Sequence, residues 1–431
     1  MMNSLENFFH LFTLDSAVPV IDKTNWQNLL EEYGKDDVKL ALATYIDEWN
    51  PPFPYRNIPI EKVRTRFRKL YKTSMQKMLI QEDVKVLEKF EYENNYDKCG
   101  LGLIQMGNSY NSVSDYFQNK NRMSCGSYGF RSPVWRWEHG DLKDITQLIS
   151  PIFRLTETNP ALTTESYRQA FRLGSYVASQ FKPNVAKLMY EMHDAKNIFD
   201  MSCGWGDRLA GFWATPGTTL YVGCDPNENT FAEYKTQCLF YHNELGGGVY
   251  SEKEDDDYYE FVGRKHVIIY NLPAEDLPWE DLPPVDLAFS SPPYFSTERY
   301  NDDSDRRDLQ SWKRYVSFEA WRDNFLMPVL SKQFDLLVDG GYMLVNIIDP
   351  KIKTAHYPLC DYMVDKLGQI PDCNFLGQLG MRMMQRMKTL KEDEKDEFYD
   401  SIFIEPVWTF RKGLNKYETT FDVNTLEEFF V

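Results

Sequence analysis

An apolar run that ends in two consecutive prolines places the strongest constraint on this chain. Residues 285–289 are almost entirely apolar, and Ser290, Ser291, Pro292 and Pro293 follow them directly. Such a run is typical of a buried parallel strand. A proline fixes φ and lacks an N–H, so two of them cannot continue the strand. The chain must therefore turn out of a sheet here, at the carboxyl edge where open α/β sheets bind their ligands.

The residues at this turn suit the holding of a planar amine. An exocyclic amino group on a base is a poor nucleophile, because its lone pair is conjugated into the ring. Hydrogen-bond acceptors around its hydrogens, here the Ser291 hydroxyl and the Pro292 carbonyl, would stabilise the attacking form. Tyr294 and Phe295 would supply a stacking face for a base taken out of its helix. The alternative is a proline-stiffened loop with an aromatic anchor.

The sequence Ser291-Pro292-Pro293-Tyr294 resembles the catalytic motif of the amino-methyltransferases. These enzymes methylate N4 of cytosine or N6 of adenine in DNA and use S-adenosylmethionine (S-adenosyl-L-methionine). The resemblance implies that all four residues are catalytic. Serine in the first position favours N4 of cytosine.

A second turn, between residues 200 and 213, resembles the cofactor motif of the same family. A short apolar strand ends at Asp200, Gly204 and Gly206 follow, and an apolar helix comes next. Asp225 ends another short strand 19 positions after Gly206, where α/β nucleotide sites place a carboxylate for the ribose hydroxyls. A dinucleotide site is the competitor, but it prefers a third glycine, whereas Asp207 and Arg208 continue this turn.

The resemblance also assigns a role to each candidate cofactor residue. Asp200 is expected near the methionine part with Ser202 beside it, Gly204 and Gly206 along the cofactor, and Asp225 at the ribose. Phe181 and Pro183 resemble the motif that closes over the methionine end. Glu275 or Asp276 would bind the adenine amino group, since Pro273 occupies the likeliest equivalent position. Both acidic residues could instead be ordinary surface residues, and Glu298 could contact a substrate amine or cap a turn.

The fold implied by the resemblance is the α/β class I methyltransferase (Rossmann-like) fold, a mixed sheet with helices on both faces. Residues 374–379 and 401–410 would close that sheet as an antiparallel pair. We expect an N-terminal, mainly helical recognition region at residues 1–150, the methyltransferase domain at 151–415 and a tail at 416–431. The basic, methionine-rich residues 381–388 are a candidate edge contact to substrate, and the acidic run at 251–260 indicates a solvated insertion loop.

The net charge of −17 limits how this chain could bind nucleic acid. Phosphate binding needs positive charge, so any DNA or RNA surface must be a confined basic patch. The densest basic run is 61–77, where Arg64, Arg68 and Lys72 would share one helix face as a phosphate track. An ordinary solvated helix face is the alternative.

Other features of the sequence narrow the class of protein. No stretch approaches the ~20 apolar residues of a membrane helix, and no leader pattern is apparent, so a cytoplasmic (intracellular) protein is expected. The seven cysteines form no Cys-x-x-Cys pair, which favours reduced thiols and no metal site. The hypotheses are a DNA amino-methyltransferase, an RNA amino-methyltransferase, or a catalytically silent binding subunit of the same fold. The oligomeric state is not predicted.

Overall fold

The computed structural model describes residues 13–15, 18–80, 86–87, 101–127, 129–158, 160–300, 302, 304–352, 354–383 and 402–413. The chain divides into two compact units. The first, here called the helical unit, consists of Met1–Ile58, Asn119–Ser179 and Glu298–Ser304. The second, here called the sheet unit, consists of Pro59–Gln118, Gln180–Thr297 and Asp305–Val431.

The helical unit is built mainly from short amphipathic helices around a core that includes Trp26, Trp137 and Tyr167. Asp22 caps its first helix by accepting hydrogen bonds from two backbone N–H groups, as N-cap residues do. The described residues of this unit are mainly helical, although the unit is not the single segment 1–150 that the sequence predicts. Its elements are β1 (Thr13–Asp15), β2 (Val18–Val20), α2 (Lys23–Tyr33), α3 (Lys35–Trp49), β6 (Gly126–Ser127), α6 (Pro133–Glu138), α7 (Leu142–Ile149), α8 (Ile152–Thr158), α9 (Thr164–Gly174) and β13 (Glu298–Arg299).

The sheet unit holds the remaining strands and helices. The strands are β3 (Leu79–Ile80), β4 (Val86–Leu87), β5 (Leu103–Gln105), β7 (Asn197–Asp200), β8 (Leu220–Cys224), β9 (Ser251–Asp255), β10 (Tyr258–Val262), β11 (His266–Tyr270), β12 (Val285–Ser290), β14 (Leu337–Asn346), β15 (Lys351–Ile352), β16 (Ala355–His356), β17 (Cys373–Met383) and β18 (Ile402–Lys412). The α-helices are α4 (Ile60–Lys72), α5 (Ser112–Met123, of which residues 112–118 belong to this unit), α10 (Pro183–Met192), α11 (Asp207–Ala214), α12 (Glu228–Glu244), α13 (Ser311–Arg314), α14 (Phe318–Trp321), α15 (Met327–Asp335) and α16 (Cys360–Leu367). A π-helical turn (Arg322–Leu326) joins α14 to α15, and single 3₁₀ turns lie at Gln76–Met78, Ala274–Asp276, Trp279–Asp281 and Arg307–Leu309.

The order of the strands fixes where a ligand site can form. Five parallel strands lie in the order β11-β8-β7-β12-β14, so the chain builds outward from β7 on one side and then returns to β12 on the other. The carboxyl ends of the neighbouring strands β7 and β12 therefore lie at the topological switch point, where open α/β sheets bind their ligands. β18 runs antiparallel between β14 and β17, as the sequence predicts.

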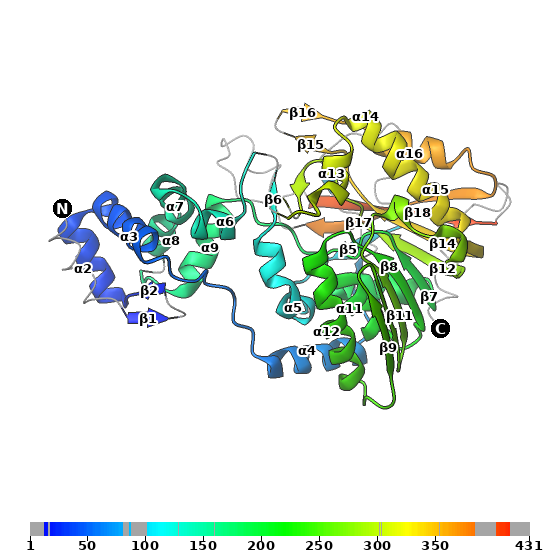
Figure 1. The fold of residues 1–431 in the computed structure, drawn as a ribbon, viewed down its shortest axis with the longest axis horizontal. Coiled ribbons are helices and arrows are strands. Elements are labelled where there is room, and N and C mark those ends of the chain that lie inside the picture. The colour runs from blue at the N-terminus through cyan, green and yellow to red at the C-terminus, as the bar shows by residue number, and fades with distance from the viewer. Residues whose placement is uncertain are drawn as a thin grey trace. The chain divides into compact units, whose positions relative to one another are not determined.

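Both faces of this sheet are covered, because alternate residues of each strand point to opposite sides. Ile198, Leu287 and Phe289 pack in one core with α10, α11 and α12. Phe199 and Ala288 pack in the other, with α15 and α16. Figure 1 shows these two groups of helices on opposite faces of the sheet. The predicted fold class, a mixed α/β sheet with helices on both faces, is confirmed.

The division of the chain differs from the single boundary predicted at residue 150. Residues 151–179 belong to the helical unit, because α9 buries Tyr167 and Phe171 in its core. Residues 59–118 belong to the sheet unit, where α4 buries Phe67 and Leu70 in the core that it shares with α11 and α12. Residues 384–388 and the predicted tail at 416–431 lie outside the described residues.

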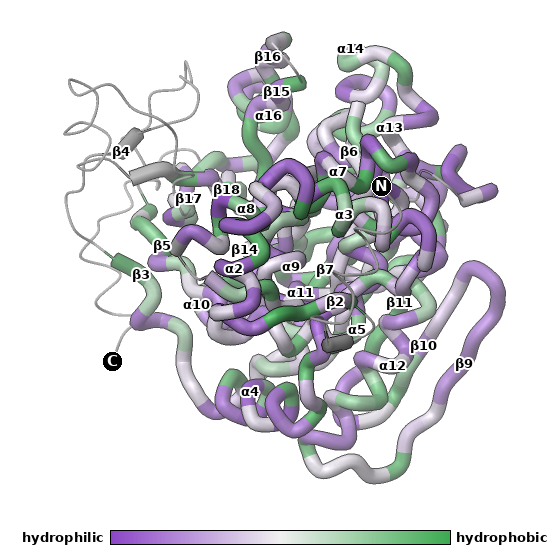
Figure 2. The backbone as a smooth tube through the Cα atoms, turned by 90° about the vertical axis from the view of Figure 1, so that its left-hand side faces the viewer, coloured by the Kyte–Doolittle hydropathy of each residue, from purple (hydrophilic) through white to green (hydrophobic). Residues whose placement is uncertain are grey.

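The acidic run at 251–260 is a β-hairpin rather than the expected loop. β9 and β10 pair from Ser251↔Val262 to Asp255↔Tyr258. All of β9 is exposed, whereas Tyr259 and Phe261 of β10 are buried. Figure 2 shows β9 as a largely hydrophilic segment at the border of the sheet. Among the helices that the structure describes, none is long and apolar enough to cross a membrane.

Candidate functional site

The turn between β7 and α11, here called the glycine turn, needs both of its glycines. Gly204 and Gly206 adopt φ values of 56° and 68°, in the left-handed region that favours glycine. A Cβ at Gly206 would lie 2.3 Å from Gln237 Oε1, so the turn packs directly against α12. A Cβ at Gly204 would meet only Ser202 O, at 3.7 Å. The backbone at Gly204 is therefore open to the approach of a ligand.

Asp225, which directly follows β8, is tied to the glycine turn. Its Oδ2 accepts a hydrogen bond from Gly204 N at 2.8 Å, and its Oδ1 accepts one from Asn227 N at 3.0 Å. Burial raises the pKa of this carboxyl group to about 6, although both backbone donors act in the opposite direction. The structure thus brings the predicted ribose carboxylate and the first glycine into direct contact.

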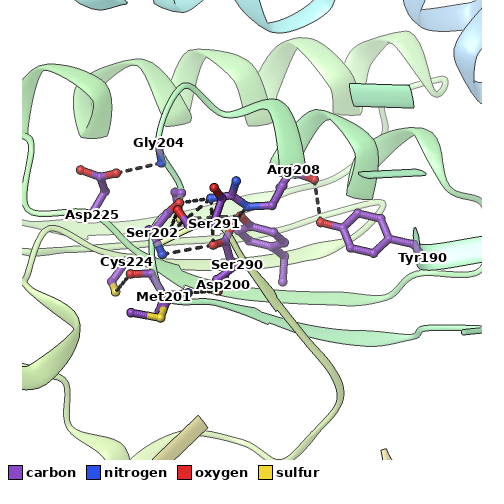
Figure 3. A network of polar contacts seen from close by, with 12 residues as sticks. Tyr190, Asp200, Met201, Ser202, Gly204, Arg208, Cys224, Asp225, Ser290 and Ser291 are labelled. Atoms are coloured by element: carbon purple, nitrogen blue, oxygen red, sulfur yellow. Dashed lines mark hydrogen bonds and ion pairs between the residues drawn. The ribbon is translucent and has the colours of Figure 1, made fainter. Parts of the chain in front are cut away.

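The turn that follows β12, here called the proline turn, lies against the glycine turn. Met201 N donates to Ser290 Oγ at 2.8 Å, and Ser202 Oγ donates to Ser291 O at 2.9 Å. Figure 3 shows these contacts beside the Gly204–Asp225 bond. The two turns identified in the sequence therefore meet at the switch point of the sheet.

Asp200, which the resemblance places near the methionine part of the cofactor, has both carboxylate oxygens engaged by protein groups. Its side chain is fully buried, and its carboxylate binds Arg208 Nε at 2.7 Å and Nη2 at 3.2 Å. Tyr221 OH and Ser202 N also donate to it, at 2.6 and 3.1 Å. Asp200 is thus one half of a buried ion pair that holds the start of α11 against the sheet.

Tyr294 is held by residues that the sequence analysis missed. Its hydroxyl donates to Glu405 and lies 3.3 Å from Asn346 O, while Asn346 Nδ2 donates to Glu405 Oε1 at 3.2 Å. Burial and the nearby Glu405 carboxylate raise the pKa of this phenol well above its usual value. The available signal was a glutamate within the otherwise apolar residues 402–410.

Phe295 does not offer the stacking face predicted for it. Only 7% of the residue is exposed, and its ring lies 5.7–5.9 Å from the rings of Phe318, Trp321 and Tyr357. It is an anchor that fixes the end of the proline turn in the hydrophobic core. Pro292 is buried as well, whereas Ser291, Pro293 and Tyr294 are partly exposed.

Phe181 lies beside the buried ion pair. The Phe181 ring lies 5.5 Å from Arg208 Cζ and 5.5 Å from the ring of Phe289, the residue just before the proline turn. Pro183 is the first residue of α10, a position where the missing N–H costs nothing. Phe181 therefore borders the region where the two turns meet, and Pro183 begins the helix two residues further along the chain.

The two candidates for the adenine contact are distinguished by their partners. Glu275 Oε1 accepts hydrogen bonds from Arg314 Nη1 and Tyr315 OH, both at 3.1 Å, and Arg314 Nη2 binds Asp276 Oδ2 at 2.7 Å. Within the described part of the chain, the buried Glu275 Oε2 has no hydrogen-bond partner. Glu275 therefore keeps a free acceptor near the end of β11, and Asp276 is a more exposed member of the same ion-pair group.

The predicted phosphate track is at the opposite edge of the sheet. Arg64 and Arg68 do share a face of α4, but both bind Glu244, at 3.2 and 2.8 Å, and Arg64 also binds Glu61. Glu244 ends α12, whose 17 residues span about 25 Å from the carboxyl edge. These two arginines are therefore ion-pair partners within the fold and do not face the site. Lys72 is exposed in the last turn of the same helix.

Glu298 belongs to the helical unit. Its carboxylate accepts hydrogen bonds from Tyr176 OH and Tyr300 OH. These contacts anchor β13, which pairs with β6. These contacts fit a structural role for Glu298, such as the alternative of capping a turn, better than a contact with a substrate amine.

An open cavity of about 810 Å³ lies by the end of β11. Arg306, in its wall, binds Asp257 Oδ1 at 2.7 Å and Asn271 O at 3.1 Å. The wall is acidic and would repel phosphate. Its lining residues are Glu228, Phe231, Ala232, Lys235, Glu254, Asp255, Asp256, Asp257, Asn271 and Arg306. Among the described residues, no group of three or more His, Cys, Asp and Glu could hold a metal ion.

Comparisons with known proteins give matches in structure only. No family model matches the sequence, and no curated protein does. TehB from Haemophilus influenzae aligns with 58% of this chain and 68% of its own, with a TM-score of 0.31 and 11% identity. A putative rRNA-methylase from Clostridium thermocellum aligns over 56% and 99%, with a TM-score of 0.30 and 11% identity. The N-methyltransferase NodS from Bradyrhizobium japonicum WM9, in complex with S-adenosyl-l-homocysteine, aligns over 53% and 84%, with a TM-score of 0.29 and 10% identity. The fold assignment rests on the strand order described above.

Proposed function

We propose that this protein transfers a methyl group from S-adenosylmethionine to the exocyclic amino group of a base in DNA. N4 of cytosine is the favoured target, with N6 of adenine the second. The observation that carries the proposal is the contact between the two turns, in which Ser202 Oγ donates to Ser291 O at 2.9 Å. This contact puts a candidate cofactor turn and a candidate catalytic turn at one edge of one sheet.

The residues at this edge fit S-adenosylmethionine in three respects. Gly204 leaves its backbone open, with no atom other than Ser202 O within 4 Å of a Cβ position. Asp225 presents a carboxylate next to it, suited to the ribose hydroxyls. Glu275 keeps an oxygen without a partner among the described residues, suited to the adenine amino group.

The bound cofactor would supply an electrophilic methyl group on a sulfonium. The chain would supply the orientation of the amine. Because the Ser291 carbonyl already accepts from Ser202, the Ser291 hydroxyl and the Pro292 carbonyl are the candidate acceptors for the amine hydrogens. Acceptors fixed on a proline-stiffened turn need no rearrangement when charge develops on the nitrogen. Glu405 fixes the hydroxyl of Tyr294 and with it the plane of the ring.

The test is to identify the methylated nucleoside directly. DNA and RNA are each incubated with the protein and S-adenosylmethionine that carries a deuterated methyl group, and the digested nucleosides are analysed by mass spectrometry. We expect labelled N4-methylcytosine in DNA, and Ser291→Ala should abolish it while the affinity for S-adenosylmethionine, measured by calorimetry, is kept. If the label appears in RNA alone, the substrate is RNA and not DNA. No binding of S-adenosylmethionine by the wild-type protein would overturn the proposal.

Asp225→Ala is the companion variant for the cofactor. It removes the carboxylate proposed for the ribose, so binding of S-adenosylmethionine should fall by about tenfold or more. Asp286→Asn is a control at the amino edge of the sheet, where the carboxylate binds Lys196 N and Asn197 N at 2.9 and 3.0 Å. Unchanged binding in Asp225→Ala would show that the pocket is assigned wrongly.

A further inference from the structure

A buried polar cluster, here called the Asp207 cluster, lies at the start of α11. Gln180 Nε2 donates to Asp207 Oδ1 and Asn111 O, both at 2.9 Å, and to Ser114 Oγ at 3.0 Å. The Ser114 hydroxyl also donates to Asp207 Oδ1. Ser112 is the first residue of α5 and Asp207 the first of α11. The first turns of two helices thus meet around one carboxylate, directly after the glycine turn.

The cluster is incomplete. Among the described residues, Asp207 Oδ2, Asn111 Oδ1 and Ser112 Oγ are buried and have no hydrogen-bond partner. Asp207 and Ser112 are only 2% and 6% exposed. Buried polar atoms are nearly always paired, and leaving one unpaired costs about 1–3 kcal/mol. Two of these three atoms are pure acceptors, so the missing partner is a hydrogen-bond donor.

The raised pKa of the Asp207 carboxyl group indicates that the missing partner is positively charged. Burial raises the pKa of Asp207 to about 7, although Ser114, Gln180 and Lys182 act to lower it and Asp115 acts with burial. A positively charged donor would restore the ionised form and satisfy Oδ2 in one step. Asp200, the acid first expected at this end of the cofactor, is unsuitable because Arg208 and Tyr221 already occupy it.

We infer that Asp207 binds the α-ammonium group of the methionine part of S-adenosylmethionine, with Asn111 Oδ1 as a second acceptor. This inference rests on the proposed function and adds a recognition residue to it. Asp225 holds one end of the glycine turn and Asp207 follows its other end, three residues after Gly204. One carboxylate would thus recognise the ribose and the other the amino-acid end.

The experiment compares two ligands that differ in that end. 5′-Methylthioadenosine keeps the adenine, the ribose and the sulfur but lacks the ammonium and carboxylate groups. Calorimetry gives the Kd of each ligand for the wild-type protein, Asp207→Asn and Asp286→Asn. We expect Asp207→Asn to weaken the binding of S-adenosylmethionine about 10- to 100-fold, because a hydrogen bond to its charged ammonium group is lost. The binding of 5′-methylthioadenosine, which lacks that group, should weaken less than about threefold. Asp286→Asn should change neither.

A second measurement needs no variant. Between pH 5.5 and 7 an α-amino group stays mostly protonated, while the ionised fraction of Asp207, whose pKa is about 7, increases. The affinity for S-adenosylmethionine should therefore rise over this range relative to that for 5′-methylthioadenosine. The ratio of the two cancels the contribution of Asp225, which titrates near pH 6 but would bind the part common to both ligands.

The outcomes separate the inference from the proposal beneath it. If the wild-type protein binds neither ligand, the proposed function itself fails. If it binds S-adenosylmethionine but Asp207→Asn has the same ratio of affinities for the two ligands as the wild type, and this ratio does not change with pH, the inference alone is overturned. Equal weakening of both ligands by Asp207→Asn would also overturn it, because that pattern indicates a general disturbance of the pocket.

Discussion

The two edges of the central sheet use charged residues in different ways. At the amino edge the charges are closed into the fold. Lys187 Nζ donates to Leu70 O, Tyr71 O and Ala214 O at 2.7–2.9 Å. Glu244 binds two arginines of α4. Each of these groups has a partner that the chain itself supplies.

At the carboxyl edge two carboxylates are left incomplete. Asp207 Oδ2 and Glu275 Oε2 are buried without a hydrogen-bond partner among the described residues. Among the described residues, the buried carboxylate oxygens without a hydrogen-bond partner are both at the carboxyl edge. Under the proposed function these two oxygens would bind the cofactor, whereas the charges of the amino edge stabilise the fold.

The largest expected effect comes from the buried ion pair between Asp200 and Arg208 at the carboxyl edge. Arg208→Met leaves Asp200 buried and unpaired, and the free energy of unfolding in urea should fall by about 3–5 kcal/mol. The double variant Asp200→Asn with Arg208→Met removes the unpaired charge and should recover part of that loss. A single variant within about 1 kcal/mol of wild type would show that this pair is not structural.

A smaller loss is expected at the amino edge from Lys265→Met. Lys265 Nζ donates to Phe212 O at 2.8 Å and also contacts Thr215 O and Thr218 Oγ1. Its removal loses these hydrogen bonds from a buried amine and should cost about 2 kcal/mol. Binding of S-adenosylmethionine should be unchanged. A fall in affinity would contradict the separation of the two edges.

The pH dependence of stability gives a second readout for Lys265. Burial lowers its pKa to about 7, below the usual value of 10.5, so between these values the unfolded chain binds one proton more than the folded protein. The wild-type free energy of unfolding should therefore rise from pH 7 toward pH 10 relative to that of Lys265→Met. Parallel pH profiles would show that this lysine stays protonated in the fold.

The contacts that the sequence predicts are the ones set by local geometry. Gly204 lies in the turn after β7 and Asp225 directly follows the neighbouring strand β8, so their meeting follows from strand order and a short spacing. Buried Tyr259 and Phe261 alternate with the less buried Tyr258, Glu260 and Val262, and this period of two is typical of a strand. It is the local signal for the hairpin at 251–262.

The contacts that the sequence does not predict join distant segments. Glu405 reaches Tyr294 across 111 residues, and Glu244 reaches Arg68 across 176. The helical spacing of Arg64 and Arg68 is right, but no local pattern says which partner that face meets. Asp200 is a similar case, since its role depends on how Arg208 and Tyr221 converge on it.

At the carboxyl edge, Tyr294→Phe isolates the contact with Glu405. The variant keeps the ring and removes the hydroxyl, so methyl transfer should fall about tenfold while affinity for S-adenosylmethionine is kept. Methyl transfer by Glu405→Gln should fall by a similar factor. The double variant should be no slower than either single variant, because both substitutions remove the same hydrogen bond. Additive losses would mean that the two residues act separately.

The smallest effect is expected for Arg68→Ala, which tests whether the amino edge has any part in substrate binding. The arginine side chain is 60% exposed in its pair with Glu244, so the free energy of unfolding should change by less than about 1 kcal/mol. Because Arg68 lies at the far end of α12 from Asp225, the affinity for DNA and its dependence on salt should match wild type. A phosphate contact at Arg68 would instead weaken DNA binding and lower the slope of affinity against salt by about one, whatever the DNA sequence. That result would place nucleic acid on the edge whose charges are already paired, and the contrast between the two edges would no longer hold.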